Sequence, residues 1–173
     1  AVSYGYMTFG VTAHSPATNP KFLYEEEVAA GLSAGDLAQK FGKYAATCAE
    51  LVNEYSDRIE ILLGAEVEVV PETGFAQNAA DLRGKYKLDY LVGSVHWVDE
   101  MPFDTSREDF DKAVANRGGL EPFVLRYYEL VGEMIEQLRP EVIGHIDLPR
   151  LFSEGAPELE SDSVMKAVYA AFE

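Results

Sequence analysis

The sequence predicts an α/β protein in which buried strands bring histidines to one rim of a sheet. Short apolar runs alternate with longer stretches of helical period, which is typical of βα units rather than of a sandwich. The chain has three histidines, and each closes one of the apolar runs, at His14, His96 and His145. Parallel strands bring their last residues to a common rim, where sites are built. We therefore expect the three imidazoles to belong to a metal centre.

The alternative is that each histidine has a purely structural role. A single histidine beside apolar residues is more often a hydrogen-bonded structural side chain than a ligand. The shared position at the end of an apolar run argues against three independent structural histidines. Each is also followed by a polar or turn-forming segment.

Four apolar runs are expected to form strands, in residues 10–14, 59–70, 88–96 and 142–145. Within the second run, residues 61–64 show no alternation of polar and apolar side chains, which indicates burial on both faces. Glu66 and Glu68 follow, and strand periodicity places both on one face. This face could simply be solvated. A carboxylate at the end of a buried strand, however, needs a cation or a hydrogen-bond partner.

Helices are expected in residues 37–55, 77–85, from 106 onward, 122–138 and 161–172. Asp36 can cap the first, whose apolar residues recur every three or four positions and face the core. Acidic residues in the first turn after Ser106 suit the helix dipole. Pro122 fits a first turn, and Pro140 stops that helix. The last helix is amphipathic.

Composition restricts the class of protein. The 173 residues are 47% hydrophobic and 12% aromatic, which supports a single domain over residues 1–173 and excludes intrinsic disorder. A formal net charge of -16 opposes non-specific binding to nucleic acid or to an anionic membrane. Cys48 is the single cysteine, which excludes an intrachain disulfide, and no apolar stretch is long enough to span a bilayer. These features predict a cytoplasmic protein.

The side chains expected at the rim indicate a class of chemistry. Imidazole nitrogen with carboxylate oxygen, and without thiolate, suits Zn, Mn or Fe in a site that keeps positions open for water or substrate. Such a centre lowers the pKa of a bound water and can hold the oxygens of a phosphoryl group. The residues thus predict metal-assisted hydrolysis of a small-molecule phosphate ester, without identifying the ester.

Four motifs follow one another along the chain. They are GVTAHSP at residues 10–16, YSDRI at 55–59 leading into LGAEVE at 63–68, LDYLVGSVH at 88–96 with Pro102-Phe103-Asp104 after it, and VIGHIDL at 142–148. In this order they resemble the motifs of the polymerase-and-histidinol-phosphatase (PHP) superfamily, specifically its histidinol-phosphatase branch. The resemblance covers nearly the whole chain, and its third and fourth motifs are the most specific.

The resemblance implies a distorted (β/α)7 barrel with up to three divalent metal ions at the strand ends. It also implies hydrolysis of L-histidinol phosphate to L-histidinol and phosphate in histidine biosynthesis, with no catalytic group beyond a metal-activated water. By this resemblance His14, Glu66, His96 and His145 match metal ligands. Glu68 does not, because the family's ligand is the first carboxylate of its motif.

Two further residues follow the last strand. Arg150 stands where the resemblance places a cation for the substrate phosphate, although a solvated arginine near a turn is the alternative. Asp147 is expected to orient a ligand without binding the metal itself.

The sequence departs from the family pattern in two respects. Family members begin with a strand carrying His-x-His and later carry Asp-x-His on a final strand, and this chain has neither. We expect those ligands before Ala1 and after Glu173, so that the barrel is incomplete at both ends. Ala13 also replaces the Asp that the family places beside its histidine.

Two other functions are compatible with these residues. One is hydrolysis of a different small phosphate by a PHP phosphoesterase, because metal ligands alone do not distinguish leaving groups. The other is metal binding without catalysis, because four ligands spread over three ions leave each ion under-coordinated.

Overall fold

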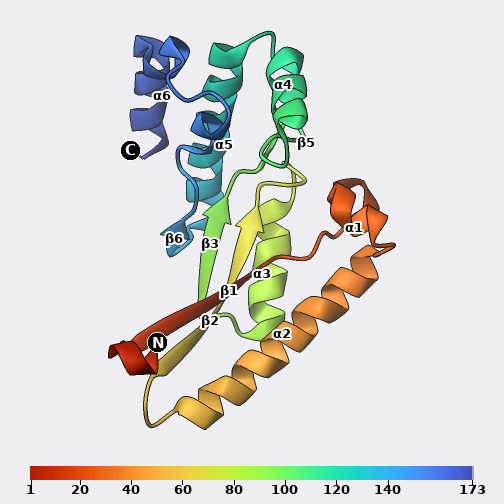
Figure 1. Cartoon of the computed structure of the whole chain (residues 1–173), viewed down its shortest axis with the longest axis vertical. Coiled ribbons are helices and arrows are strands. Elements are labelled where there is room, and N and C mark those ends of the chain that lie inside the picture. The colour runs from red at the N-terminus through yellow and green to blue at the C-terminus, as the bar shows by residue number, and fades with distance from the viewer. Residues whose placement is uncertain (173) are drawn as a thin grey trace. The chain divides into compact units, whose positions relative to one another are not determined.

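A computed structural model describes residues 1–172 of the chain (Figure 1). Contacts divide the chain into two compact units, Ala1–Val67 with Gln77–Val92, and Glu68–Ala76 with Gly93–Glu173. The main sheet has the strand order β1-β2-β3-β6, and the division between the units passes through β2 (Glu60–Glu68) and β3 (Tyr90–Ser94). The predicted α/β class is confirmed.

The first unit is built on two parallel strands. β1 (Thr8–His14) pairs with β2 in a register that places His14 opposite Glu66. The long helix α2 (Ala34–Tyr55) contacts β1 (Figure 1). It buries Phe41 and Cys48, two members of its predicted apolar stripe, together with Ala45. Most of α3 (Phe75–Tyr86) also belongs to this unit, as does the short α1 (Glu25–Ala29). The ends of β1 and β2 therefore bring a histidine and a glutamate together.

The start of α2 corrects one prediction, because Ser33 and not Asp36 is its N-cap. The Ser33 hydroxyl accepts from the backbone N–H of Asp36 at 3.2 Å, and the Asp36 carboxylate accepts from the backbone N–H of Ser33 at 2.9 Å. This reciprocal capping box satisfies two backbone donors at once. The helix consequently begins three residues earlier than the predicted Leu37 and ends at the predicted Tyr55.

One aromatic ring occupies the face of β1 and β2 that carries His14 and Glu66. Tyr90 is hydrogen-bonded through its hydroxyl to the hydroxyl of Thr12, and its ring covers Gly64. A Cβ at Gly64 would collide with Cζ of Tyr90, so a larger residue does not fit beside this ring. Thr12 and Gly64 are opposite each other in the register, two positions before His14 and Glu66. The Tyr90 ring therefore packs on the same strand face as His14 and Glu66, next to that pair on the side of the strand starts.

The second unit is organised around α5 (Leu120–Leu138). Its side chains Phe123, Tyr127 and Leu130 are fully buried, and α6 (Asp162–Ala171) packs along it. The predicted starts of α4 (Arg107–Asn116) and α6 are confirmed, because Ser106 and Ser161 are their N-caps.

The remaining elements of the chain are short: β4 (Trp97–Val98), β5 (Met101–Pro102), β6 (Val142–Ile143) and the 3₁₀ helices η1 (Val2–Tyr4), η2 (Pro20–Phe22), η3 (Leu148–Leu151) and η4 (Pro157–Glu160).

Two predicted strands end before their histidines. β3 stops at Ser94, and His96 is followed at once by the two-stranded antiparallel sheet of β4 and β5. β6 ends at Ile143, because His145 has a φ of 50°, a left-handed conformation that cannot continue a strand. His96 and His145 therefore lie in the loops that follow the strands.

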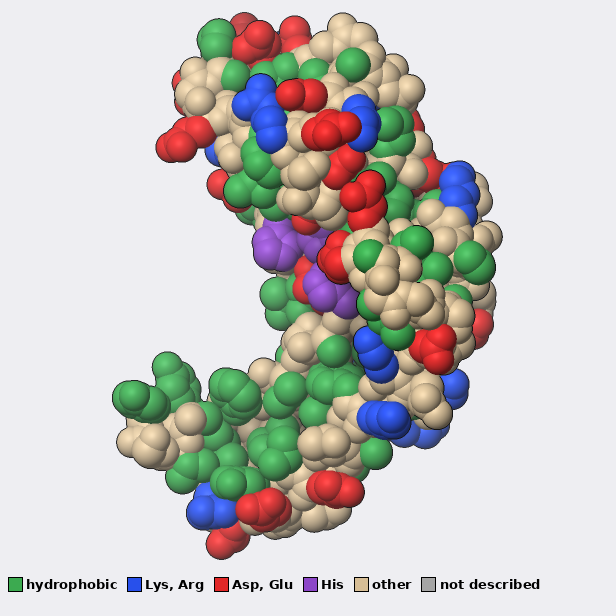
Figure 2. All heavy atoms as spheres, turned by 45° about the vertical axis from the view of Figure 1, so that its right-hand side comes forward, with side chains coloured by type: hydrophobic (Ala, Val, Ile, Leu, Met, Phe, Trp, Pro, Cys, Tyr) green, Lys and Arg blue, Asp and Glu red, His purple; other side chains and the backbone are tan. Residues whose placement is uncertain are grey.

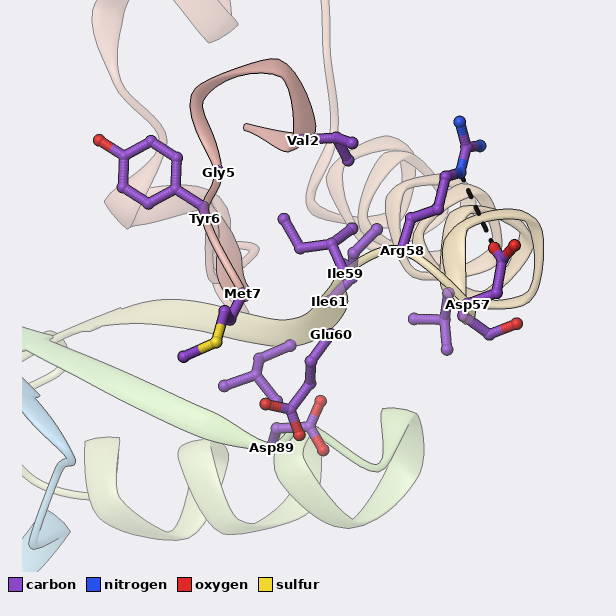
Figure 3. Close-up of a pocket in the computed structure, with 13 residues that line it drawn as sticks. Val2, Gly5, Tyr6, Met7, Asp57, Arg58, Ile59, Glu60, Ile61 and Asp89 are labelled. Carbon is purple, nitrogen blue, oxygen red and sulfur yellow. Dashed lines mark ion pairs between the residues drawn. The ribbon is translucent and has the colours of Figure 1, made fainter.

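In the first unit, the surface at the N-terminal ends of the strands differs from the surface at their C-terminal ends. Exposed apolar side chains gather there, from Val2, Tyr6, Met7 and Phe9 (Figure 2). A pocket of about 730 Å³ adjoins them, and its lining combines apolar residues with polar and charged ones, among them Asp57, Arg58 and Glu60 (Figure 3). Among residues 1–172, every helix is too short or too polar to cross a membrane.

Candidate functional site

His14 and Glu66 form the part of the candidate site that lies in the first unit. His14 Nε2 lies 3.7 Å from Glu66 Oε2, and the two side chains are 59% and 16% exposed. The backbone N–H of Ser15 donates to the carbonyl of Glu66 at 2.8 Å, which extends the pairing past the end of β1. A pocket of about 500 Å³ adjoins His14 and is also lined by Glu27 and Lys40. The pair is thus held by the sheet and remains open to a ligand.

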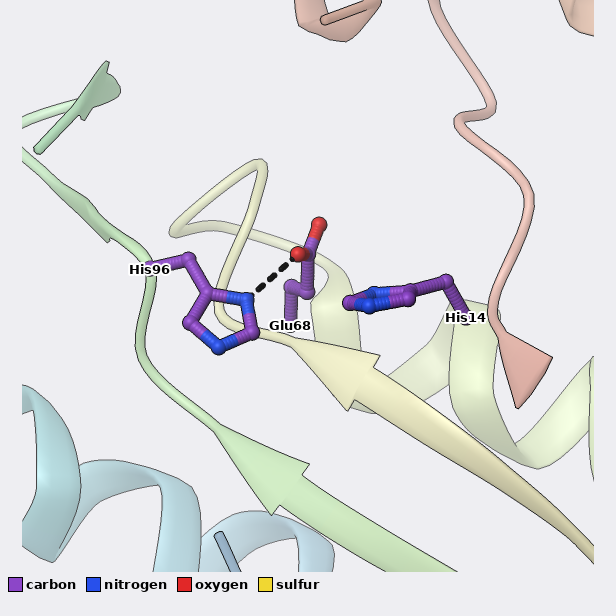
Figure 4. A group of neighbouring side chains, drawn as sticks. All are labelled: His14, Glu68 and His96. Carbon is purple, nitrogen blue, oxygen red and sulfur yellow. Dashed lines mark hydrogen bonds and ion pairs between the residues drawn. The ribbon is translucent and has the colours of Figure 1, made fainter. Parts of the chain in front are cut away.

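Glu68 and His96 form a second pair, in the second unit. Glu68 Oε1 lies 2.7 Å from His96 Nδ1 (Figure 4), and the side chains are only 9% and 5% exposed. The backbone N–H of Val69 donates to the carbonyl of Ser94 at 3.3 Å, which ties the segments that carry the two residues. When Nδ1–H donates to the carboxylate, Nε2 is the nitrogen that can bind a metal. With Glu68 on Nδ1, Nε2 is the nitrogen of His96 that could bind a metal.

His145 lies beside His96. The ring centroids are 5.2 Å apart, and one nitrogen of each ring lies within 4.8 Å of the other. The carbonyl of His145 accepts a hydrogen bond from the hydroxyl of Tyr127, a fully buried side chain of α5. Burial raises the pKa of Tyr127 well above its usual value, so the phenol stays a neutral donor. The backbone of His145 is thereby fixed to the core of its unit.

Asp104 is a third acidic group of this region. Its neighbour Phe103 is fully buried and donates its backbone N–H to the carbonyl of His96 at 3.1 Å. Burial raises the pKa of Asp104, and the nearby charges of His96 and His145 partly oppose that increase. Its atom Oδ1 is buried without a hydrogen-bond partner among residues 1–172. Asp104 thus places an unsatisfied acceptor near the two histidines.

The donor set in each unit is suited to a metal ion. The first unit supplies one imidazole and one carboxylate, and the second supplies two imidazoles with two carboxylates nearby. Nitrogen and oxygen donors without sulfur match the preferences of Zn, Mn and Fe. The thiol of Cys48 is buried on α2, where burial raises its pKa. It therefore lacks the properties of a ligand or nucleophile.

The predicted substrate residues are in and next to η3. Arg150 is exposed on η3, and its positive charge acts on Tyr128. Asp147 is the N-cap residue of η3, but its exposed side chain forms no hydrogen bond or ion pair within the described part of the chain. The roles of Arg150 and Asp147 stay predictions.

Three residues of this region were not predicted to support the site. Glu68 was set aside as a metal ligand. Because Glu66 and Glu68 share a strand face, the sequence did not indicate that Glu68 has His96 as a partner of its own. Asp104 had a sequence signal, since it closes the Pro102-Phe103-Asp104 motif. Tyr127 had none, because it belongs to the apolar stripe of a core helix.

A family model described as "PHP domain" matches residues 1–173. A protein of Schizosaccharomyces pombe named "Probable histidinol-phosphatase" is 38% identical over 166 residues, which are 94% of this chain and 53% of that protein. The "Histidinol-phosphatase" of Saccharomyces cerevisiae is 28% identical over 162 residues, which are 87% of this chain and 48% of that protein. The chain thus spans about half the length of these curated relatives.

The fold is also similar to a solved structure, the crystal structure of a candidate histidinol phosphatase from Listeria monocytogenes. The TM-score is 0.77 at 22% sequence identity, over 98% of this chain and 67% of that chain. This likeness shows that the α/β arrangement described above occurs in a known protein fold.

Proposed function

Since this chain belongs to the PHP domain family, we propose that the protein containing it is a metal-dependent phosphomonoester hydrolase of the histidinol-phosphatase type. The proposed reaction converts L-histidinol phosphate and water to L-histidinol and phosphate, as a step of histidine biosynthesis. One observation carries the proposal. His96 lies beside His145, with its Nδ1 bound by the buried carboxylate of Glu68, in a chain 38% identical to a relative named for this activity.

The metal ligands that we propose are His14, Glu66, His96 and His145. They would hold divalent ions, Zn, Mn or Fe, with up to three in the complete site. A bound metal would supply positive charge to activate water and to stabilise the oxygens of the phosphoryl group. The Nδ1 hydrogen bond of His96 supports this role, because metal-binding imidazoles usually donate their other N–H to a carboxylate or a carbonyl.

Other side chains would act on the substrate or on the ligands. We assign Arg150 to the substrate phosphate, because a guanidinium presents several donors to phosphate oxygens. We assign Asp147 to the orientation of a ligand. Tyr127 would hold His145 in place through the backbone carbonyl.

The proposal extends to the architecture and location of the whole protein. The strands would form part of a distorted (β/α)7 barrel, which the likeness to the Listeria monocytogenes structure supports. A reducing compartment such as the cytoplasm fits the single, buried thiol of Cys48.

Phosphate release by the full-length protein tests the substrate. The panel contains L-histidinol phosphate, several other small phosphomonoesters and one phosphodiester, each with added Zn²⁺ or Mn²⁺. We expect kcat/KM to favour L-histidinol phosphate by at least about tenfold, since even small differences in the contacts to a substrate give discrimination of that size. A preference for another monoester would identify a different PHP phosphoesterase. Failure to hydrolyse any of them would leave metal binding without catalysis as the correct description.

A further inference from the structure

Asp104 has an unsatisfied acceptor in a position that the rest of the fold holds firmly. It follows β5, and its neighbour Phe103 is fully buried and bonded to the backbone of His96. Oδ1 of Asp104 is buried and lacks a hydrogen-bond partner among residues 1–172. A buried acceptor without a partner is destabilising, and such groups are rare in native proteins. The orphaned oxygen therefore points to a partner from outside the chain.

The neighbours of Asp104 indicate where that partner lies. The charged groups that act on its carboxyl are His96, Glu68 and His145. Within residues 1–172, some groups of three histidine and acidic residues bring their donor atoms within 4.8 Å of one another. Asp104 belongs to none of these groups. Asp104 is thus beside the proposed metal ligands of this unit but not among them. Its partner is better explained as part of a bound substrate than as the metal.

The chemistry of the carboxylate indicates the kind of group that it binds. Within the described residues, no lysine or arginine forms an ion pair with Asp104. A protonated amine would supply the missing hydrogen bond from a charged donor. In L-histidinol phosphate the amine is on the carbon next to the one that bears the phosphate ester. A group that recognises this amine must therefore lie close to the ligands that hold the phosphate.

We propose that Asp104 accepts a hydrogen bond from a protonated amine of the substrate, and so selects phosphomonoesters with an amine beside the ester carbon. This inference rests on the proposed function. It adds to that function the residue that recognises the amine of the substrate, a role that the metal ligands cannot fill.

Asp104→Asn in the full-length protein is the main test, because it removes the charge and keeps the shape. The kcat/KM for L-histidinol phosphate is compared with that for 3-(imidazol-4-yl)propyl phosphate, which lacks the amine. We expect the variant to lose about 10- to 100-fold with the first ester and less than about threefold with the second, as for a lost charged hydrogen bond. Asp111→Asn, at an exposed position on α4, removes the same charge and is expected to change neither value.

Binding of L-histidinol, followed by calorimetry, separates this inference from the proposed function. It measures recognition of the amine without any hydrolysis. Weaker binding of L-histidinol to the variant, with binding of inorganic phosphate unchanged, would support the inference even if the protein hydrolysed no ester. Equal losses with both esters, a lower metal content by mass spectrometry, or unchanged binding of L-histidinol would each overturn it. If Asp104→Asn fails to fold, Asp104→Ser is compared in the same way.

Discussion

Glu68 Oε1 and His96 Nδ1 are 2.7 Å apart, and their side chains are 9% and 5% exposed. In such a buried place the carboxylate fixes both the orientation and the tautomer of the ring. Glu68 and Glu66 are two residues apart on β2, so one strand carries both a proposed ligand and the residue that orients another ligand. The end of β2 therefore both carries a proposed ligand and orients the ring of His96.

Glu68→Ala is expected to weaken metal binding by about 10- to 100-fold, because the His96 ring loses the group that orients it. Glu68→Gln is expected to lose less, because its amide oxygen still accepts from Nδ1–H. Zn²⁺ titration by calorimetry measures both. Glu60→Ala, at the opposite end of the same strand, is the matched control and should bind metal normally. Normal metal binding by Glu68→Ala would contradict the positioning role.

Tyr127→Phe removes the hydrogen bond to the His145 carbonyl and leaves the ring in the core. The expected loss of unfolding free energy is about 0.5–1.5 kcal/mol, the usual net value of one such bond. Urea denaturation measures this loss, and NMR of the His145 ring measures its mobility. Tyr128→Phe, at the neighbouring and less buried position, should leave the His145 signal unchanged. Identical His145 signals in wild type and Tyr127→Phe would show that the bond does not position this histidine.

Gly64→Ala should be destabilising by about 1–3 kcal/mol, because the new Cβ collides with the Tyr90 ring. The same substitution should cost less in a Tyr90→Leu background, where the ring is absent. A double-mutant cycle of unfolding free energies measures this coupling. Additive effects of the two substitutions would show that the ring does not require the glycine.

The start of α4 should give a pH-dependent contribution to stability. Hydrogen bonds from Ser106 and Thr105 hold the pKa of Asp109 below its usual value of 3.8. A lowered pKa in the folded state means that the carboxylate stabilises the fold above pH 3.8, and that this effect is lost as the pH falls through the folded value. The difference in unfolding free energy between wild type and Asp109→Asn should therefore be constant near neutral pH and shrink in acid. A difference that does not change with pH would contradict this.

The capping serine itself can be tested at neutral pH. Ser106→Ala should lower the free energy of unfolding by about 1 kcal/mol, because the backbone N–H of Asp109 loses its acceptor. Thermal unfolding of the variant measures the change. A stability equal to that of the wild type would mean that the cap is dispensable.

Most helices could be predicted from the sequence, because periodicity and capping residues are local signals. Ser106 and Ser161 show this for α4 and α6. The start of α2 was misplaced, because Ser33 and Asp36 are both good caps and only their reciprocal bonds separate them. The five-residue α1 was missed, because little more than one turn is too short to show a period.

The site could be predicted only in part. Histidine and glutamate at the ends of apolar runs are a pattern that the sequence shows for His14 and Glu66. The register of β1 and β2 places these two residues side by side. The left-handed backbone of His145 had no local signal, since a tyrosine far along the chain holds its carbonyl. The orphaned oxygen of Asp104 depends on burial, which a single sequence does not reveal.

Phosphate release from L-histidinol phosphate, measured before and after removal of bound metal, tests the central claim most directly. Chelation of the full-length protein should lower the rate at least about 100-fold, and added Zn²⁺ or Mn²⁺ should restore it. The His96→Ala variant should stay inactive when Zn²⁺ or Mn²⁺ is added at the concentrations that restore the wild-type rate. An unchanged rate after the metal has been removed, with its absence confirmed by mass spectrometry, would contradict the account.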